Sequence, residues 1–218
     1  MNDTAPLSRE DEFVLDTPLI RAFISEARQL LAGPSDISAR LAALQPHVQA
    51  LLADQTWLPA EYSVPFAASG MGGGIGTWLL FRAADRSLTL FSLVVPPGAS
   101  TPVHDHLAWG LIGLYRGTQD ETVYRRSDDG TDPQHARLEV AQVNHLQPGD
   151  LYTLLPPDGD IHAVTTTSRE ASISIHMLAN DTGCVLRHAF EPQHELVRPF
   201  RSGYSNAPCT DMPSRDSI

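Results

Sequence analysis

Three histidines are spaced as metal ligands would be. His104 and His106 lie one residue apart, after a run that is typical of a strand. Alternate side chains of an extended strand point to the same face, so both imidazoles face one way and Asp105 faces the other. His162 follows in a later segment and can complete a face of three nitrogens. The residues therefore predict a catalytic metal site with open positions opposite the imidazoles.

Glycines and a proline surround these histidines at a recognised spacing. The first half of the cupin motif is a glycine, five intervening residues, a histidine, one intervening residue and a second histidine. Gly98, His104 and His106 match it. Gly149 and the run Pro157-Asp158-Gly159-Asp160-Ile161-His162 match the second half. His-x-His alone is a weak signal, but both halves together resemble the metal site of the cupins. The resemblance implies a mainly β fold, the cupin double-stranded β-helix or jelly-roll barrel; the alternative is a metal-free cupin with surface or core histidines.

Position 110 departs from the general cupin pattern. Many cupins place a glutamate four residues after the second histidine, where this chain has Gly110. Three neutral imidazoles without a carboxylate leave a divalent ion its full charge, so the site is expected to attract an anionic ligand such as a thiolate. Imidazole suits iron, nickel, copper or zinc, and the ligand type alone does not select the metal.

The histidine segment has a closer resemblance. Residues 101–113, TPVHDHLAWGLIG, resemble the metal-binding strand of the cysteine dioxygenase family of thiol dioxygenases, nearest the bacterial branch with 3-mercaptopropionate dioxygenases. The likeness covers residues 75–190. It implies a mononuclear Fe(II) centre held by His104, His106 and His162. It also implies oxidation of a small carboxylated thiol, of cysteine or 3-mercaptopropionate type, to its sulfinic acid with O₂. Nickel or zinc can replace iron during purification.

The resemblance gives roles to four further residues. Ser174 and His176 match two members of the family's Ser-x-His-x-Tyr run and are expected to form a catalytic hydrogen-bonded relay beside the metal. Arg187 matches the arginine that binds the substrate carboxylate, a role that suits a guanidinium fork. Trp109 is expected in the wall of the substrate pocket. The alternatives are an ordinary buried pair for Ser174 and His176, a surface salt bridge for Arg187 and a core position for Trp109.

The family's tyrosine is replaced by Leu178, which cannot donate a hydrogen bond. Another hydroxyl then supplies the bond, with Tyr124, Tyr152 and Tyr204 as unranked candidates, or the substrate differs, or activity is weak. Two other functions therefore stay open. One is a metal-dependent cupin oxygenase with a non-thiol substrate, and the other is a metal-binding cupin without enzymatic activity.

Two amphipathic helices precede the β region. Thr17-Pro18 is typical of an N-cap followed by proline at the first helical position, and Gly33-Pro34 is expected to end that helix. Ser35 is expected to cap the second helix with Asp36 in its first turn, and Pro46 to kink or break it. Residues 1–15, before both helices, are expected to fray.

Short β-like runs separated by turns follow the helices. They span 77–82, 87–95, 107–115, 119–126, 136–146, 151–155, 161–167 and 171–178. Gly70–Gly76 lacks the features of a phosphate-binding loop and is expected to be a flexible entry loop. One structural domain is expected, with a helical cap at 1–56, a cupin barrel at 57–190 and a C-terminal extension at 191–218.

The acidic composition limits the partners. Lys and Arg number 15 against 26 Asp and Glu, and the net charge of −11 argues against nucleic acid and an anionic membrane. Cys184 and Cys209 are too few for a disulfide framework, and neither a signal pattern nor a bilayer-length apolar run is present. A cytoplasmic protein is therefore expected, with a small thiol and O₂ as partners. No sequence feature indicates an oligomeric state.

Overall fold

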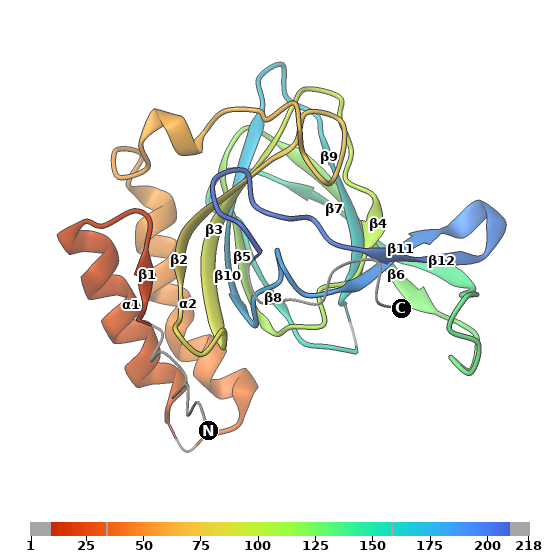
Figure 1. Cartoon of the computed structure of the whole chain (residues 1–218), viewed down its shortest axis with the longest axis horizontal. Coiled ribbons are helices and arrows are strands. Elements are labelled where there is room, and N and C mark those ends of the chain that lie inside the picture. The colour runs from red at the N-terminus through yellow and green to blue at the C-terminus, as the bar shows by residue number, and fades with distance from the viewer. Residues whose placement is uncertain (1–9, 34, 158, 210–218) are drawn as a thin grey trace, which may run out of the picture.

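The chain folds as two facing antiparallel sheets with two helices against one of them (Figure 1). The computed structural model describes residues 10–33, 35–157 and 159–209. The outer parts of the expected cap and extension, residues 1–9 and 210–218, lie outside the described residues, as do Pro34 and Asp158.

The first helix begins as predicted. In α1 (Pro18–Leu31) the Thr17 hydroxyl accepts a hydrogen bond from the Ile20 backbone N–H at 3.2 Å. This bond satisfies one of the amide groups that a helix start leaves free. The expected fraying is wrong for Glu12–Phe13. These residues form β1, which pairs antiparallel with β2 (Gly76–Arg82).

The second helix corrects two predictions. α2 (Ile37–Ala53) is capped by Asp36 rather than Ser35, because the Asp36 carboxylate accepts from the Ala39 N–H at 2.9 Å. The expected break at Pro46 is wrong, since α2 continues through that residue. Pro46 lies on the exposed side of the helix, where its ring meets solvent rather than the core.

Each sheet contains six strands. The first has the order β1-β2-β3-β10-β5-β8 and includes β3 (Leu88–Val95), β5 (Gly110–Arg116), β8 (Leu151–Leu154) and β10 (Ser172–Ala179). The second has the order β12-β11-β4-β9-β6-β7 and consists of β4 (Val103–His104), β6 (Gln119–Arg126), β7 (Leu138–Leu146), β9 (Ile161–Thr166), β11 (Arg187–Glu191) and β12 (Leu196–Phe200). All eight predicted runs are strands, and β1, β4, β11 and β12 are additional.

The chain alternates between the sheets. It passes from β3 in the first sheet to β4 in the second, back to β5 and across to β6; after the β6–β7 hairpin it alternates again through β8, β9, β10 and β11. Such alternation between two packed antiparallel sheets is the jelly-roll arrangement. The mainly β, double-stranded β-helix fold of the cupins with an N-terminal helical cap is therefore confirmed.

The first sheet is buried on both faces, which fixes its position. Every residue of β3 and β10 is buried. One face packs on α1 and α2 in a shared core, and Gly113 on β5 allows the close approach of α2, because a Cβ there would overlap the Leu52 side chain. The other face points into the barrel, where the functional residues lie.

The C-terminal segment crosses the barrel rather than leaving it. After β12, residues 201–209 run over the barrel, as the dark blue trace in Figure 1 shows, and reach the part of the β2 edge that β1 leaves unpaired. The Ser205 N–H donates to the Thr77 carbonyl at 2.6 Å. A disulfide joins Cys184 to Cys209, a bridge that the cysteine count did not predict. Disulfides are rare in a reducing cytosol, so the cysteines do not support the expected cytoplasmic location.

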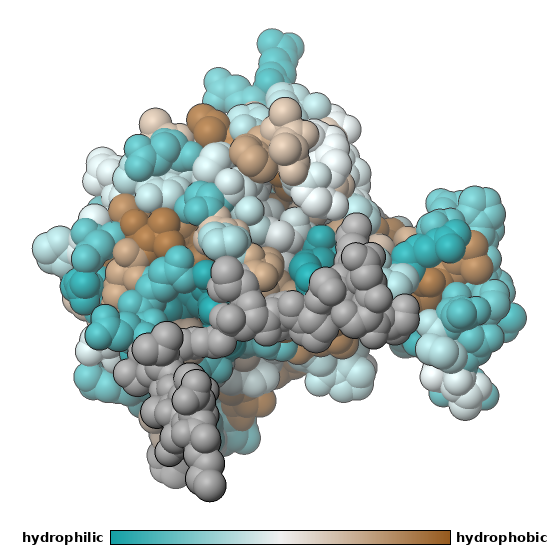
Figure 2. Space-filling model, viewed as in Figure 1, coloured by the Kyte–Doolittle hydropathy of each residue, from teal (hydrophilic) through white to brown (hydrophobic). Residues whose placement is uncertain are grey.

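The surface mixes residue types. In Figure 2, hydrophobic residues form small groups among hydrophilic ones on the face shown. Two of the exposed large hydrophobic residues, Val140 and Val143, lie on the edge strand β7. None of the described helices is long and apolar enough to cross a membrane.

Candidate metal centre

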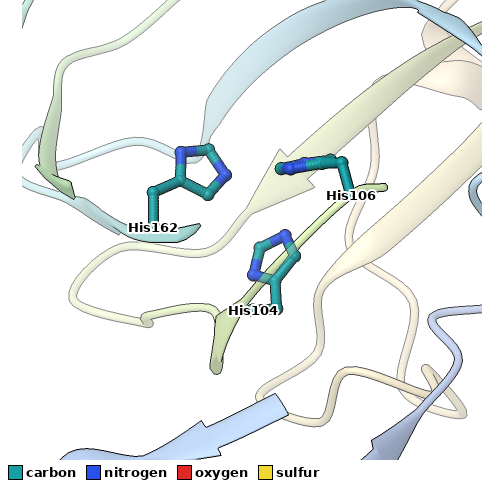
Figure 3. A group of neighbouring side chains, drawn as sticks. All are labelled: His104, His106 and His162. Carbon is teal, nitrogen blue, oxygen red and sulfur yellow. The ribbon is translucent and has the colours of Figure 1, made fainter. Parts of the chain in front are cut away.

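Strand register brings the three histidines together. In the β4–β9 pair, His104 lies directly opposite His162. His106 follows in the turn before β5, and Figure 3 shows the three rings facing a common centre. One potential ligand atom from each residue lies within 4.8 Å of the others, and all three residues are buried. As predicted, Asp105 points away and accepts hydrogen bonds from His188 on β11.

Oxygen acceptors engage the outer nitrogen of each ring. His104 Nδ1 lies 2.8 Å from the Pro102 carbonyl oxygen, and His162 Nδ1 lies 2.7 Å from the Glu121 carboxylate. His106 Nδ1 makes a longer contact of 3.4 Å with the Asp160 carbonyl oxygen. Because carbonyl and carboxylate oxygens only accept, each Nδ1 carries the hydrogen and each Nε2 keeps its lone pair.

The charge state also suits metal binding. Burial lowers the pKa of His104 and His106 well below the ordinary histidine value, and the positive charges of Arg187 and the neighbouring imidazoles lower it further. His104 and His106 are therefore neutral at physiological pH, as metal ligands must be. With His162 they form a set of three oriented imidazoles that fits a divalent transition metal. They do not select among iron, nickel, copper and zinc.

Two buried carboxylates support the histidines, and sequence reasoning missed both. Glu121 on β6 binds His162 and also accepts from the Asn144 side chain at 2.8 Å. Burial opposes its ionisation, but the hydrogen bond and charge interaction with His162 and the hydrogen bonds of Asn144 and Tyr152 outweigh burial and lower its pKa. Asp160 accepts from the backbone N–H groups of His106 and Leu107 at 3.0 and 3.1 Å. Neither carboxylate belongs to the three-histidine group, and both orient it from outside.

Glu121→Gln is expected to weaken metal binding about tenfold to a hundredfold, the usual effect of losing an outer partner of a metal ligand. The substitution keeps the shape of the side chain and removes the negative charge that makes His162 a stronger donor. Competition with a chromophoric chelator measures the change. Glu139→Gln on exposed β7 is the control, and equal affinity in Glu121→Gln and the native protein would contradict the role.

Gly110 explains the missing fourth ligand. An added Cβ would overlap the Met177 carbonyl oxygen on β10 and lie 2.7 Å from the Leu178 side chain, so no glutamate fits here. Gly110→Ala is expected to lower the free energy of unfolding by about 3 kcal/mol and Tm by about 6–12 °C. Gly33→Ala, whose Cβ stays 3.2 Å from its nearest neighbour, should change Tm far less in the same calorimetric scan. An unchanged Tm for Gly110→Ala would refute this packing.

Ser174 and His176 lie together in the same barrel. The Ser174 hydroxyl lies 2.8 Å from His176 Nε2, and both residues line the cavity in front of the three histidines. The His176 ring stacks on Phe91 with a centroid distance of 4.6 Å. Burial, with the charges of His162 and Arg187, lowers the pKa of His176 to about 3, so the ring is neutral. Its Nδ1 is buried with no hydrogen-bond partner among the described residues.

Arg187 is buried in the wall of this cavity, and the surface salt bridge considered for it is wrong. The guanidinium donates to the Asp105 carbonyl, to the Thr182 carbonyl at 3.1 Å and to the Ser202 hydroxyl at 3.1 Å. Within the described part of the chain, no carboxylate lies within salt-bridge distance of it. Burial lowers its pKa to about 10, against the opposing charge of Asp105, so it stays protonated at neutral pH. A buried cation with only neutral partners attracts an anion.

Trp109 does not lie where the sequence prediction placed it. It is half-buried and packs against the core between the helices and the first sheet, rather than lining the cavity. Its neighbour Ala108 packs in the apolar cluster inside the barrel, and Trp109 lies on the opposite side of the sheet. Leu178, in the place of the family tyrosine, is buried in an apolar cluster inside the barrel.

Tyr152 is the tyrosine candidate that lines the cavity, with its ring centroid 6.4 Å from that of His162. Burial and the Glu121 carboxylate, to which its hydroxyl hydrogen-bonds, raise the pKa of that hydroxyl well above the ordinary value, so it stays protonated. Tyr204 instead donates to Asp181 at 2.9 Å, and Tyr124 faces an outer groove.

The cavity itself is small and mainly apolar on its remaining sides. Its volume is about 10 Å³, near the room that one water molecule needs. Phe91, Leu93 and Val164 form the apolar wall, and Met71 from the glycine-rich loop lies at its rim. The site therefore accommodates small ligands, and larger ones require side chains such as Met71 to move.

No protein-family model matches the chain. Solved structures that resemble it include the Cnp3 cupin domain of Schizosaccharomyces pombe, with 18% identity and a TM-score of 0.37, covering 50% of this chain and 66% of that one. An RmlC-like cupin from Shewanella frigidimarina has 19% identity and a TM-score of 0.37, covering 50% and 79%. A cupin-2 domain protein from Rhodospirillum rubrum has 19% identity and a TM-score of 0.36, covering 48% and 59%. These scores are low, and the strand order given above remains the basis of the fold.

Proposed function

We propose that this protein is a mononuclear non-haem iron enzyme that oxidises a small carboxylated thiol to its sulfinic acid with O₂. One observation carries the proposal: a buried three-histidine face lines the same cavity as a buried arginine that has no carboxylate partner among the described residues. A metal-binding group on one side and an anion-binding group on the other suit a ligand with a thiolate and a carboxylate.

The residues around the cavity have separable roles in this proposal. Arg187 binds and orients the carboxylate with the guanidinium hydrogens that its three protein bonds leave free. Ser174 and Tyr152 offer hydroxyl donors, and the neutral His176 holds Ser174 in place. The apolar wall excludes water and strengthens these polar contacts. When bound, iron supplies the redox chemistry that lets a thiol react with O₂.

Tyr152 supports a thiol substrate despite Leu178. Tyr152 on β8 and Ser174 on β10 belong to the same sheet, and both residues line the cavity. We therefore assign to Tyr152, with its hydroxyl turned from Glu121 toward the ligand, the donor role that the tyrosine after the Ser-x-His pair has in the cysteine dioxygenase family. A metal-dependent cupin with a non-thiol substrate, or one without enzymatic activity, remains the alternative.

Oxygen uptake distinguishes these functions. The metal-free protein is loaded with Fe(II) without oxygen, and uptake is followed with 3-mercaptopropionate, cysteine and cysteamine. One O₂ is consumed for each thiol lost, because both oxygen atoms enter the sulfinic acid. The two carboxylated thiols are expected to react, and cysteamine, which lacks a carboxylate, to react at least about a hundredfold more slowly. No uptake with any thiol by the iron-loaded protein would refute the proposal.

A further inference from the structure

A second pocket lies at the rim of the barrel beside the metal cavity. It has a volume of about 240 Å³ and lies between the glycine-rich loop and the C-terminal segment, and we call it the rim pocket. The two segments touch directly, since a Cβ on Gly70 would overlap the Ser202 carbonyl oxygen. Ser202 lines both the rim pocket and the metal cavity, so the two spaces are neighbours.

Two donors in the rim pocket lack partners. Within the part of the chain that the structure describes, the Thr77 hydroxyl is buried with no hydrogen-bond partner, and the residue is only 3% exposed. Arg201 Nε is likewise buried without a partner. Among the described residues, the Arg201 guanidinium has no ion-pair partner. Leaving such groups unpaired costs free energy, so their presence in one pocket points to a ligand that accepts from both.

Serine hydroxyls add further donors. The Ser69 and Ser205 hydroxyl oxygens accept from backbone N–H groups at 3.1 and 3.0 Å, and Ser202 accepts from Arg187 at 3.1 Å. Each of these oxygens is used as an acceptor, so its own hydrogen is free to donate. The ten lining residues include no aspartate or glutamate. In a chain of net charge −11, the lining of this pocket is thus rich in donors and free of carboxylates.

We propose that the rim pocket binds an oxyanionic group, a carboxylate or a phosphate. Arg201 supplies the charge and the paired N–H groups, and Thr77 with the serines donates to the remaining oxygens. The group belongs either to a separate small anion or to the far end of an extended ligand whose other end passes Ser202 into the metal cavity.

Calorimetric titration of the metal-free protein with inorganic phosphate and with succinate tests the pocket independently of iron and of catalysis. The native protein is expected to bind at least one of the two anions, and Arg201→Gln to bind it at least tenfold more weakly. Thr77→Val tests the buried hydroxyl and should weaken binding severalfold. The matched control is Arg198→Gln, an exposed arginine on the preceding strand β12 that pairs with Glu191 on β11, which should bind as the native protein does.

The result also separates the rim pocket from the metal cavity. Arg187→Gln, in the cavity, should leave phosphate binding in place. No binding of either anion by the native protein, or binding that is lost in Arg187→Gln and kept in Arg201→Gln, would overturn the proposal. Circular dichroism of each variant confirms folding.

A kinetic arm identifies the source of the anion and rests on the proposed function. With the iron-loaded protein, Arg201→Gln is compared on 3-mercaptopropionate and on γ-glutamylcysteine, a thiol extended by a second carboxylate. A KM that rises at least tenfold for the extended thiol alone assigns the pocket to the far end of a substrate. Unchanged KM values, together with lost phosphate binding, assign the rim pocket to a separate anion. Either of these two kinetic results supports an anion site in the rim pocket.

Discussion

Replacing any one of His104, His106 and His162 with alanine is expected to remove stoichiometric metal binding. Each ring presents one free Nε2 to the common centre, and each is oriented by a separate oxygen acceptor. Losing an outer partner of a metal ligand costs tenfold to a hundredfold in affinity, so losing a ligand itself is expected to cost more than about a hundredfold. Metal content after equilibrium dialysis, close to one ion per native chain, should fall below a tenth.

An exposed histidine provides the control for this loss. His145 on β7 pairs with Asp120 at the surface, and His145→Ala should bind metal as the native chain does. Metal at a hundredfold excess over its dissociation constant adds about 2.7 kcal/mol to stability, which raises Tm by about 5–11 °C. The three ligand variants should lack this rise. Full metal content in any of these variants would show that the replaced histidine is not a metal ligand.

Arg187→Gln is expected to lower kcat/KM for 3-mercaptopropionate by about a hundredfold or more. Each hydrogen bond to a charged group contributes about 1.5–3 kcal/mol, and a bidentate carboxylate makes two. Arg187→Lys keeps the charge without the fork and should recover only part of the rate. Initial rates of O₂ uptake measure both variants.

Cysteamine distinguishes a loss of carboxylate binding from a general loss of activity in Arg187→Gln. It carries no carboxylate, so its slow rate should not fall further in Arg187→Gln. Arg187 also holds Asp105, Thr182 and Ser202 in place, and metal content and Tm of the variants show whether those contacts matter to folding. An equal loss of rate on both thiols, with full metal content, would mean that Arg187 does not bind the carboxylate.

Much of the fold follows from local patterns. The eight runs between residues 77 and 178 could be predicted as strands because turn residues separate them. The N-cap of α1 could be predicted because the Thr17 hydroxyl, just before Pro18, accepts a hydrogen bond from a free backbone N–H of the first turn. The metal histidines were predictable because their spacing is encoded in two short segments. The start of β5 at Gly110 instead of 107 reflects the turn that carries His106, where Leu107 has a φ of 52°.

The rest depends on contacts between distant segments. Glu121 reaches His162 only through the β6–β9 register, which no local pattern reveals. β12 was hidden by Pro199, which is tolerated because β12 is an edge strand. The disulfide between Cys184 and Cys209 requires the C-terminal segment to cross the barrel, which its polar, proline-rich sequence does not indicate.

The mass of the product formed under ¹⁸O₂ tests the central claim most directly. Iron-loaded protein is allowed to turn over 3-mercaptopropionate in ¹⁸O₂, and the product is analysed by mass spectrometry. A sulfinic acid that carries two ¹⁸O atoms is predicted, formed by the native chain and absent from His162→Ala. Recovery of unchanged thiol, or of its disulfide alone, would contradict the assignment of this three-histidine site to thiol dioxygenation.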